Sequence, residues 1–533
     1  MNPLIVDALA TGQGKRMATR DVIGAGPRAV AGVLEQRGLE PRIAVAEAVL
    51  NGQIELKDYD ILLVSGMSSD YPAVRRVISK WKVTSKGPIL IGGPLSSSPE
   101  DALVRAKGDL AIIGEAEHTL GELLNMGLDC GRLPSKKALS QMLGIAYLDG
   151  AAVKMRGLRP VMAREAYDST TPSTKIIKDY PLFYAARVYV EVLRGCSNYL
   201  RSRIALPGGT CVGCDLCRSG GLEDRYDCPI GIPPGCGYCS VPSLYGPPKS
   251  RSVEKICDEI RGLLSEGVRR IVLSAPGFLD YGRDLLVEPK PLTDPRRPEP
   301  NYEALERLLS RIMEMDEFTD GEASVMIENI KGALVTDHAA DLLGRYLQGT
   351  PVNIGFETGS EQHSLQLGRP STPEENLHAV RRLRMAGLKP YVYFIHGLPG
   401  QNNETVVETV KAMGESVESG ASRIILYRFQ PLPMSAFCDL PMAPPAAKDH
   451  LSGQIFTAAQ EANRALKEEL VGRRVRVIIA EQYERDNNFL VAYPLKHGPV
   501  VLVEGAEGLV GDVVEVAVSG VVSDRMVMGR LRR

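Results

Sequence analysis

"RGCSNYLRSRIALPGGTCVGCDLCRSGGLEDRYDCPIGIPPGCGYCS" spans residues 194–240 and holds seven of the chain's ten cysteines. Cys196 follows a strand-like apolar run, and Cys236 and Cys239 form a C-x-x-C pair at the other end. The insert between them, residues 197–235, carries C-x-x-C-x-x-C and a later Cys-Pro. That spacing is typical of thiolate ligation to a [4Fe–4S] cluster, and the alternative is a four-cysteine zinc site. The insert therefore predicts a metal site of its own, on Cys211, Cys214, Cys217 and Cys228.

The chain around this stretch alternates strand-like and helical segments over residues 186–445. The strand-like runs after the first are "RRIVLSAPG", "EASVMIENI", "PVNIGFETGS", "KPYVYFIHGLPG" and "SRIILYRFQPLP". Counting from Val188, they predict six βα units, which suggests a partial parallel (β/α)6 barrel. In such a barrel the chemistry lies at the carboxyl ends of the strands, and Cys196 stands at one of them.

The predicted fold class is α/β, with a further domain on each side of the barrel. Residues 1–130 read as a doubly wound parallel sheet whose strands end at the turns of Gly66, Gly93 and Gly114. Residues 131–185 are expected to form a connector, and residues 446–470 a linker helix. Residues 471–533 are Val-rich and turn-punctuated, which predicts a small all-β barrel.

Composition places the chain among ordinary globular proteins. Of its 533 residues 44% are apolar and 24% charged, and its net charge of −2 creates no field that would attract a polyanion. The sequence contains no signal-peptide pattern and no membrane-spanning apolar run, so we expect a soluble cytoplasmic protein without a membrane partner. Clustered cysteines in a reducing cytosol are metal ligands more often than disulfides. We expect the three scattered cysteines to be small buried residues: Cys130, Cys257 and Cys438.

The motifs and their order along the chain resemble those of the radical SAM superfamily, in particular of members with an N-terminal cobalamin-binding-like domain. "EVLRGCS…CGYCSVP" is similar to the superfamily's first strand and C-x3-C-x2-C motif, with an insert after the first cysteine. "ILIGGPLSSSPEDAL" and "DLAIIGEAEHTLGELL" resemble turns of the N-terminal domain, and "IGFETGSEQ", "GRPSTPEENLHAVRRLRMAGL" and "FIHGLPGQNNETVVET" resemble the second half of the barrel. The C-terminal segment is similar to a TRAM domain, and the domain order resembles that of RNA methylthiotransferases.

The resemblance implies a [4Fe–4S] cluster on Cys196, Cys236 and Cys239. Three ligands leave one iron open to chelate S-adenosylmethionine (SAM), and one electron from the cluster cleaves SAM to methionine and a 5′-deoxyadenosyl radical. The resemblance also implies a set of SAM contacts: Ser274, Ala275 and Pro276 at the methionine amino group, Glu357 and Ser360 near the ribose and carboxylate, and His396, Gly397, Pro399 and Gly400 beside the adenine.

Two departures from the family leave alternatives open. Methylthiotransferases hold a second cluster on three N-terminal cysteines, whereas the first cysteine here is Cys130. Either the insert cysteines replace that cluster or the reaction differs; four ligands leave no open iron, which favours electron transfer or a structural role. For cobalamin, no D-x-H-x-x-G motif occurs and the first histidine is His118. Cobalamin could bind through the Gly-rich turns without a protein imidazole, or the domain is a scaffold without it.

The predicted partners are an electron donor and RNA, either tRNA or rRNA. RNA follows from the resemblance, because residues 471–533 hold nine Lys/Arg against eight Asp/Glu and show basic clusters only at "GRRVR" and "MGRLRR". The leading hypothesis is a radical SAM enzyme that methylthiolates, methylates or otherwise functionalises a nucleotide in structured RNA. The alternatives are a radical SAM enzyme acting on a protein, lipid or small molecule, with the β-barrel as a docking module, and a non-enzymatic iron-sulfur scaffold.

Overall fold

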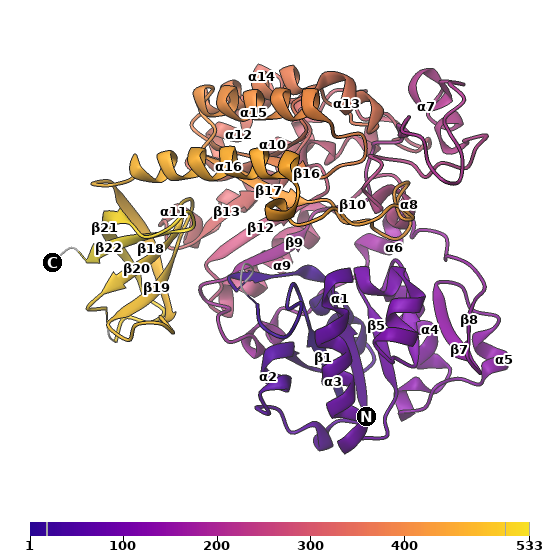
Figure 1. Ribbon diagram of the computed structural model, residues 1–533. Coiled ribbons are helices and arrows are strands. Elements are labelled where there is room, and N and C mark those ends of the chain that lie inside the picture. Colours follow the sequence, from indigo (N-terminus) through magenta and orange to yellow (C-terminus); the bar gives the residue numbers. More distant parts are fainter. Residues whose placement is uncertain (17–19, 507, 532–533) are drawn as a thin grey trace. The chain divides into compact units, whose positions relative to one another are not determined.

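The computed structural model describes residues 1–16, 20–506 and 508–531, and these divide into two compact units (Figure 1). The first unit comprises residues 1–190 and 254–268, and the second comprises residues 191–253 and 269–533. No helix in the described part of the chain is both long and apolar enough to cross a membrane.

The first unit is built on a seven-stranded sheet of order β3-β1-β4-β5-β6-β7-β8. The first five strands of that order pair in parallel, and β7 and β8 add two antiparallel strands. The central strands are apolar and buried, as expected of a sheet covered on both faces. The strands are β1 (Pro3–Asp7), β3 (Arg42–Val45), β4 (Ile61–Ser65), β5 (Ile89–Gly92), β6 (Leu110–Ile112), β7 (Ile145–Asp149) and β8 (Ala152–Met155).

Helices join these parallel strands, so the doubly wound sheet predicted from the sequence is confirmed. They are α1 (Ala25–Glu35), α2 (Ala46–Leu50), α3 (Tyr71–Thr84) and α4 (Ala116–Asn125). The segment expected to form a connector, residues 131–185, contributes β7 and β8 to the sheet. Arg28, fully buried in α1, is paired with Glu259 at 2.8 Å. Glu259 belongs to α9 (Val253–Ser265), which therefore packs in this unit.

The second unit contains the parallel βα pattern of the predicted partial barrel, which is also confirmed. β15, β16 and β17 pair in parallel, and so do β12 and β13. After β9 (Arg187–Glu191), the strands are β12 (Arg270–Ser274), β13 (Ser324–Ile327) with its continuation β14 (Asn329–Ile330), β15 (Pro351–Glu357), β16 (Lys389–His396) and β17 (Arg423–Arg428). The helices are α10 (Tyr302–Met313), α12 (Asp337–Leu347), α13 (Glu361–Gln366), α14 (Pro373–Met385), α15 (Asn403–Glu418) and α16 (His450–Glu468).

A closed five-stranded barrel ends the second unit, which confirms the third predicted domain. Its strand order is β18-β19-β20-β22-β21. Alternate residues fill its core, for example Val477 and Ile479 on β18, as the two-residue period of a strand requires. The strands are β18 (Arg474–Gln482), β19 (Phe489–Pro494), β20 (Val500–Glu504), β21 (Val513–Val521) and β22 (Met526–Leu531).

The loop between β19 and β20 joins the two barrels at the amino ends of the parallel strands. The Leu495 carbonyl accepts a hydrogen bond from Ser324, the first residue of β13. His497 Nδ1 lies 2.8 Å from the Tyr391 hydroxyl, near the start of β16. Lys496 Nζ donates to the Gln348 carbonyl, just before β15, at 3.2 Å. The small barrel is therefore seated at the end of the sheet opposite the strand ends where Cys196 stands.

We expect His497 to make stability fall in mild acid. Burial lowers its pKa to about 3, helped by the cations Lys389, Arg423 and Arg384. A histidine whose folded pKa lies below its unfolded value of 6.5 folds in its neutral form. The stability present above pH 6.5 is therefore lost as the pH falls from 6.5 toward 3.

The measurement is urea unfolding of the wild type and His497→Gln at pH 7 and pH 5. The wild type should lose about 1–2 kcal/mol more than the variant on acidification. His378→Gln, at an exposed histidine on α14, is the control and should lose as much as the wild type. Equal losses for the wild type and His497→Gln would contradict the prediction.

Candidate active site

Asn198 lies between two of the three cysteines of the interrupted motif, Cys196 and Cys236. Cys196 follows Gly195, whose φ is +91° and whose missing Cβ would lie 2.2 Å from the Pro247 carbonyl, so only glycine fits there. The Asn198 backbone N–H points at Cys196 Sγ at 3.4 Å, and its side-chain amide donates to Cys236 Sγ at 3.3 Å. Cys239 is close because its N–H donates to the Cys236 carbonyl at 2.8 Å.

Electrostatics also indicate that these sulfurs are close. Burial raises the pKa of Cys239 to about 12, and charge on Cys236 and Cys196 adds to the rise. Burial likewise raises the pKa of Cys196, which the Lys331 ammonium opposes. Three thiolates so placed repel one another unless a cationic metal centre compensates them. Among the described residues, no three His, Cys, Asp or Glu side chains are already arranged as metal ligands, so their role as cluster ligands stays a prediction.

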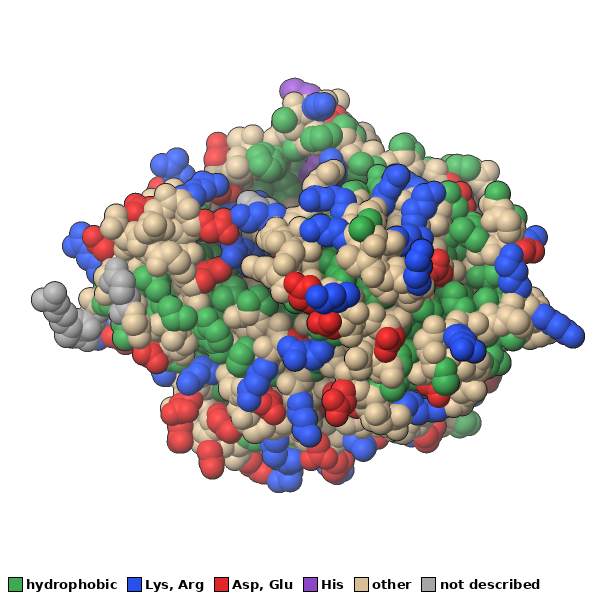
Figure 2. Space-filling view, turned by 90° about the horizontal axis from the view of Figure 1, so that it is seen from below, with side chains coloured by type: hydrophobic (Ala, Val, Ile, Leu, Met, Phe, Trp, Pro, Cys, Tyr) green, Lys and Arg blue, Asp and Glu red, His purple; other side chains and the backbone are tan. Residues whose placement is uncertain are grey.

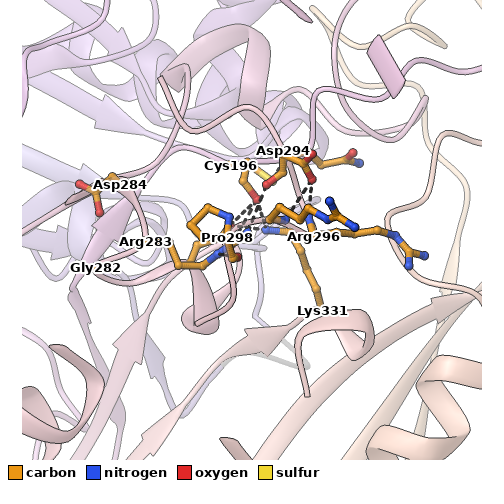
Figure 3. Close-up of polar contacts among 12 residues, drawn as sticks. Cys196, Gly282, Arg283, Asp284, Asp294, Arg296, Pro298 and Lys331 are labelled. Atoms are coloured by element: carbon orange, nitrogen blue, oxygen red, sulfur yellow. Dashed lines mark hydrogen bonds and ion pairs between the residues drawn. The ribbon is translucent and has the colours of Figure 1, made fainter. Parts of the chain in front are cut away.

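A buried charged network lies beside Cys196 (Figure 3). Asp280 forms ion pairs with Lys331 and Arg283 and accepts a hydrogen bond from Ser197 at 2.9 Å. Lys331 also donates to Ser197 Oγ at 2.8 Å. Burial alone would raise the pKa of Asp280, but Lys331 and Arg283 reverse the effect and hold it below its ordinary value. Two cations on one carboxylate leave a net positive charge in this network beside Cys196.

Arg369 is a second cation beside the cysteines. Its guanidinium donates to the Tyr238 hydroxyl at 2.8 Å and points at Cys236 Sγ at 3.5 Å. It is also 3.5 Å from the carboxylate of Glu357, whose pKa is raised by burial and held back by Arg369. Glu357 has a φ of +66°, which is rare for a residue with a side chain, and it ends β15. The structure thus places Glu357 close to Cys236 through Arg369, and its contact with SAM stays a prediction.

His363 joins two of the turns predicted to contact SAM. It is 2% exposed, and its Nε2 lies 2.8 Å from the Pro399 carbonyl. Its Nδ1 lies 3.1 Å from Thr358 Oγ1, and its N–H donates to Ser360 Oγ at 3.4 Å. The predicted contacts Ser360, Pro399 and Gly400 are therefore brought together by a residue that the sequence did not single out.

The other predicted SAM contacts are Ser274, Ala275 and Pro276 after β12, and His396 and Gly397 at the end of β16. Ser274 is already engaged, since its hydroxyl donates to Glu328 at 2.7 Å and its carbonyl accepts from Val192 at 3.0 Å. Ala275 and Pro276 follow it at the end of β12 and stay candidates. His396 is buried with its Nδ1 unpaired in the described structure, and the Gly397 N–H donates to Gln401 at 2.7 Å.

The insert is organised by two arginines that the sequence did not single out. Arg225 donates to the carbonyls of Cys217, Arg218 and Gly220, which end α7 (Leu216–Ser219), and pairs with Asp294 at 2.7 Å. Arg201 lies beside the sulfurs of Cys217 and Cys228: burial lowers its pKa and the two sulfurs oppose that change.

Three of the four insert cysteines are thereby gathered around cations. Cys217 and Cys228 share Arg201, and Cys211 and Cys217 share Arg218. Cys214 is exposed. Of the scattered cysteines only Cys257 is buried as expected. Cys130 and Cys438 are exposed, so that expectation was wrong for both: Cys130 ends the short 3-10 helix Leu128–Cys130, and Cys438 lies in a turn.

Comparison with known proteins assigns the family. Residues 228–413 match the radical SAM superfamily. A protein of Methanopyrus kandleri is 44% identical over 99% of this chain and 96% of its own length. A tRNA-2-methylthio-N(6)-dimethylallyladenosine synthase of Clostridium novyi is 23% identical over 73% of this chain and 81% of its own. The ribosomal protein uS12 methylthiotransferase RimO of a Thermotoga species is 26% identical over 54% of this chain and 63% of its own length.

The fold agrees with a solved member of the same class. The radical SAM methyltransferase TsrM of Kitasatospora setae, solved with cobalamin and a [4Fe–4S] cluster, aligns with a TM-score of 0.56 and 14% identity over 82% of this chain and 74% of its own. The chain carries a radical SAM domain and is a radical SAM enzyme with methylthiotransferase relatives. A [4Fe–4S] cluster and SAM are therefore its implied cofactors.

We expect His363→Ala to weaken SAM binding by about 10- to 100-fold, since two buried hydrogen bonds that hold the Thr358 and Pro399 turns are lost. Iron content should stay at the wild-type level because His363 does not contact the cysteines. Equilibrium dialysis with labelled SAM and iron analysis of the same samples measure both effects. His378→Ala, at an exposed site on α14, is the control; unchanged SAM affinity in His363→Ala would show that the turns hold without it.

Proposed function

We propose that this radical SAM enzyme modifies a nucleotide in structured RNA, using a SAM-binding cluster held by Cys196, Cys236 and Cys239. The observation that carries the cluster assignment is the convergence of Asn198 and Lys331 on these thiols at the carboxyl end of the barrel. The RNA assignment is supported by the closed C-terminal barrel and by the tRNA-modifying relative. Three thiols suit a cluster with one open iron.

The protein's own residues have separable tasks in this proposal. Cys196, Cys236 and Cys239 would hold the cluster, which would supply the electron for reductive cleavage of SAM. Asn198 orients two sulfurs, and the Asp280 network fixes the loop that carries Cys196. Arg369 fixes Cys236 relative to Glu357, and His363 holds the turns on which SAM is expected to lie. Burial of these groups keeps water from the reacting atoms.

A second metal is proposed for the insert, on Cys211, Cys214, Cys217 and Cys228. The insert is loop-rich and short of apolar residues, so a metal would stabilise its shape. Arg201 and Arg218 place positive charge beside the sulfurs of Cys211, Cys217 and Cys228. Four ligands would saturate a [4Fe–4S] cluster, which suits electron transfer or a structural role rather than sulfur donation.

Cobalamin is left out of the proposed reaction because the chain has no D-x-H-x-x-G motif to supply a lower axial histidine. His118, the first histidine of the chain, is exposed on α4. The Gly66 and Gly93 turns pack on each other, since a Cβ on Gly93 would lie 3.0 Å from the Gly66 carbonyl. This closeness follows from the parallel pairing of β4 and β5, whose carboxyl ends carry the two turns.

The metal assignment predicts about eight iron and eight sulfide per chain after anaerobic reconstitution, since each [4Fe–4S] cluster carries four of each. Elemental analysis measures this directly. Four iron and one zinc per chain would show that the insert holds zinc, and would leave the assignment of the SAM-binding cluster unchanged.

The substrate assignment is tested with cells that lack the gene. Nucleosides from their tRNA and rRNA should lack one modified species in mass spectrometry, and the purified enzyme with SAM and a reductant should restore it. The uS12 methylthiotransferase relative makes a protein side chain the second candidate. Unchanged nucleosides together with a mass change in a ribosomal protein would favour that candidate.

A further inference from the structure

Five cations gather where the C-terminal barrel meets the amino ends of the parallel strands. Two begin strands, two stand in the last turns of helices, and one precedes the first strand of the small barrel. We call them the cationic seat: Arg384 on α14, Lys389 on β16, Arg423 on β17, Lys467 on α16 and Arg473 before β18. They come from segments almost 90 residues apart in the chain, so the fold brings them together.

None of the five forms an ion pair with a carboxylate anywhere in the described structure. Lys467 donates to the Asn463 carbonyl at 3.1 Å, and Arg473 donates to the Glu469 carbonyl at 2.9 Å. The Arg423 guanidinium lies 5.8 Å from the centre of the Tyr391 ring. These contacts orient the side chains without neutralising their charge. Figure 2 shows one face of the molecule, on which both Lys/Arg and Asp/Glu side chains are exposed.

The seat cations are close enough to repel one another. Burial lowers the pKa of Lys389, and Arg384 and Arg473 lower it further. Burial and the Arg423 charge lower the pKa of Lys467 to about 8, against a partial rise from Asp524. Such repulsion costs stability in the free protein, and an anion that binds among the cations removes it.

Helix-end stabilisation explains only part of the seat. Cations are favourable in the last turn of a helix, which accounts for Arg384 and Lys467. Lys389 and Arg423 begin strands, and Arg473 follows a helix end rather than lying in it. The repulsion of Lys389 by Arg384 and Arg473, and of Lys467 by Arg423, therefore needs a further explanation.

We propose that the cationic seat binds the phosphodiester backbone of the RNA substrate, away from the reacting nucleotide. The inference rests on the proposed RNA substrate and adds where that RNA is held. Three guanidinium groups suit phosphates because each can donate two parallel hydrogen bonds to phosphate oxygens. Backbone contacts position a nucleic acid without reading its sequence. The seat combines residues of both barrels, so neither barrel alone provides it.

The test compares two triple variants of the full-length protein with the same charge change. Arg384→Ala/Arg423→Ala/Arg473→Ala removes seat charge, and Arg345→Ala/Arg381→Ala/Arg464→Ala removes three exposed arginines of α12, α14 and α16 outside it. Fluorescence anisotropy with labelled bulk tRNA measures the dissociation constant from 50 to 300 mM salt. The seat variant should bind tRNA about 10- to 100-fold more weakly at 100 mM salt. Its plot of the logarithm of the association constant against the logarithm of salt concentration should have a slope shallower by about two to three. The control triple should keep the wild-type slope.

A second readout separates a binding role from a structural one. Loss of seat repulsion should leave the melting temperature unchanged or raise it, whereas a structural role predicts a fall. If the triple variant folds poorly, the single variant Arg423→Gln should still make the slope shallower by about one.

Two outcomes would overturn the seat. If tRNA binds the wild type and the seat triple variant with the same salt slope, the cationic seat does not bind the RNA backbone, and the proposed RNA substrate is unaffected. If tRNA binds neither protein and poly-L-glutamate binds only the wild type, the cationic seat binds an acidic protein. The proposal of an RNA substrate is then also wrong.

Discussion

Cys236→Ala/Cys239→Ala should lose SAM cleavage entirely, by at least about a thousandfold relative to the wild type. With two of three ligands gone the SAM-binding cluster cannot assemble, and no other group in the mechanism supplies the electron. Cleavage is measured as 5′-deoxyadenosine formed under a strong reductant without RNA. Iron should fall by about four per chain, since one cluster of four irons is removed.

Cys228→Ala is the matched control because it removes a cysteine of the same stretch from the other proposed site. It should keep the SAM-bound cluster signal in electron paramagnetic resonance and lose metal only from the insert. Cys196→Ala should behave like the double variant. If Cys228→Ala loses that signal while Cys196→Ala keeps it, the two sites have exchanged a ligand and our assignment is reversed.

Asp280→Asn should destabilise the protein by about 3–5 kcal/mol, which is the usual cost of removing one partner from a buried ion-pair network. Asp280 is fully buried and compensates both Lys331 and Arg283. Its replacement leaves two cations without a counter-charge in a low-dielectric site beside Cys196. Urea unfolding under anaerobic conditions measures the loss.

Two further variants make the Asp280 result specific. Glu306→Gln breaks a surface ion pair with Arg345 and should cost less than about 1 kcal/mol. Asp280→Asn/Lys331→Met should be less destabilised than the sum of its single variants, because one uncompensated cation is removed as well. A loss below about 1 kcal/mol in Asp280→Asn would mean that water or relaxation already compensates the cations.

The sequence predicted the architecture well because strand and helix periodicity are local. Apolar runs ending in Gly-rich turns indicated the first sheet, and six repeats of that pattern indicated the central barrel. Cys196, Cys236 and Cys239 could be proposed as ligands from the sequence, since thiol spacing is visible along the chain.

The supporting residues could not be found in this way, because their partners are distant in sequence. Arg369 meets Cys236 across 133 positions, and Lys331 meets Asp280 across 51. A lone lysine after a short strand and an arginine in a Gly-rich turn carry no distinctive pattern. His363 reads as an ordinary residue in the first turn of a helix until the Pro399 turn is placed beside it. Exposed Cys130 and Cys438 show the converse error, since composition alone says nothing of which face a turn presents.

The length of β16 sets the distance between the cationic seat and the proposed SAM site, and so a minimum length for the substrate. The strand has eight residues, starts at Lys389 in the cationic seat and ends at His396 near the proposed SAM turns. At about 3.3 Å per residue, the two ends are roughly 25 Å apart. An RNA held at the seat must extend over that length to bring a base to the radical. A minimal loop oligonucleotide should therefore react with a raised KM, and lengthening its stem should restore affinity in a step once the stem spans the barrel.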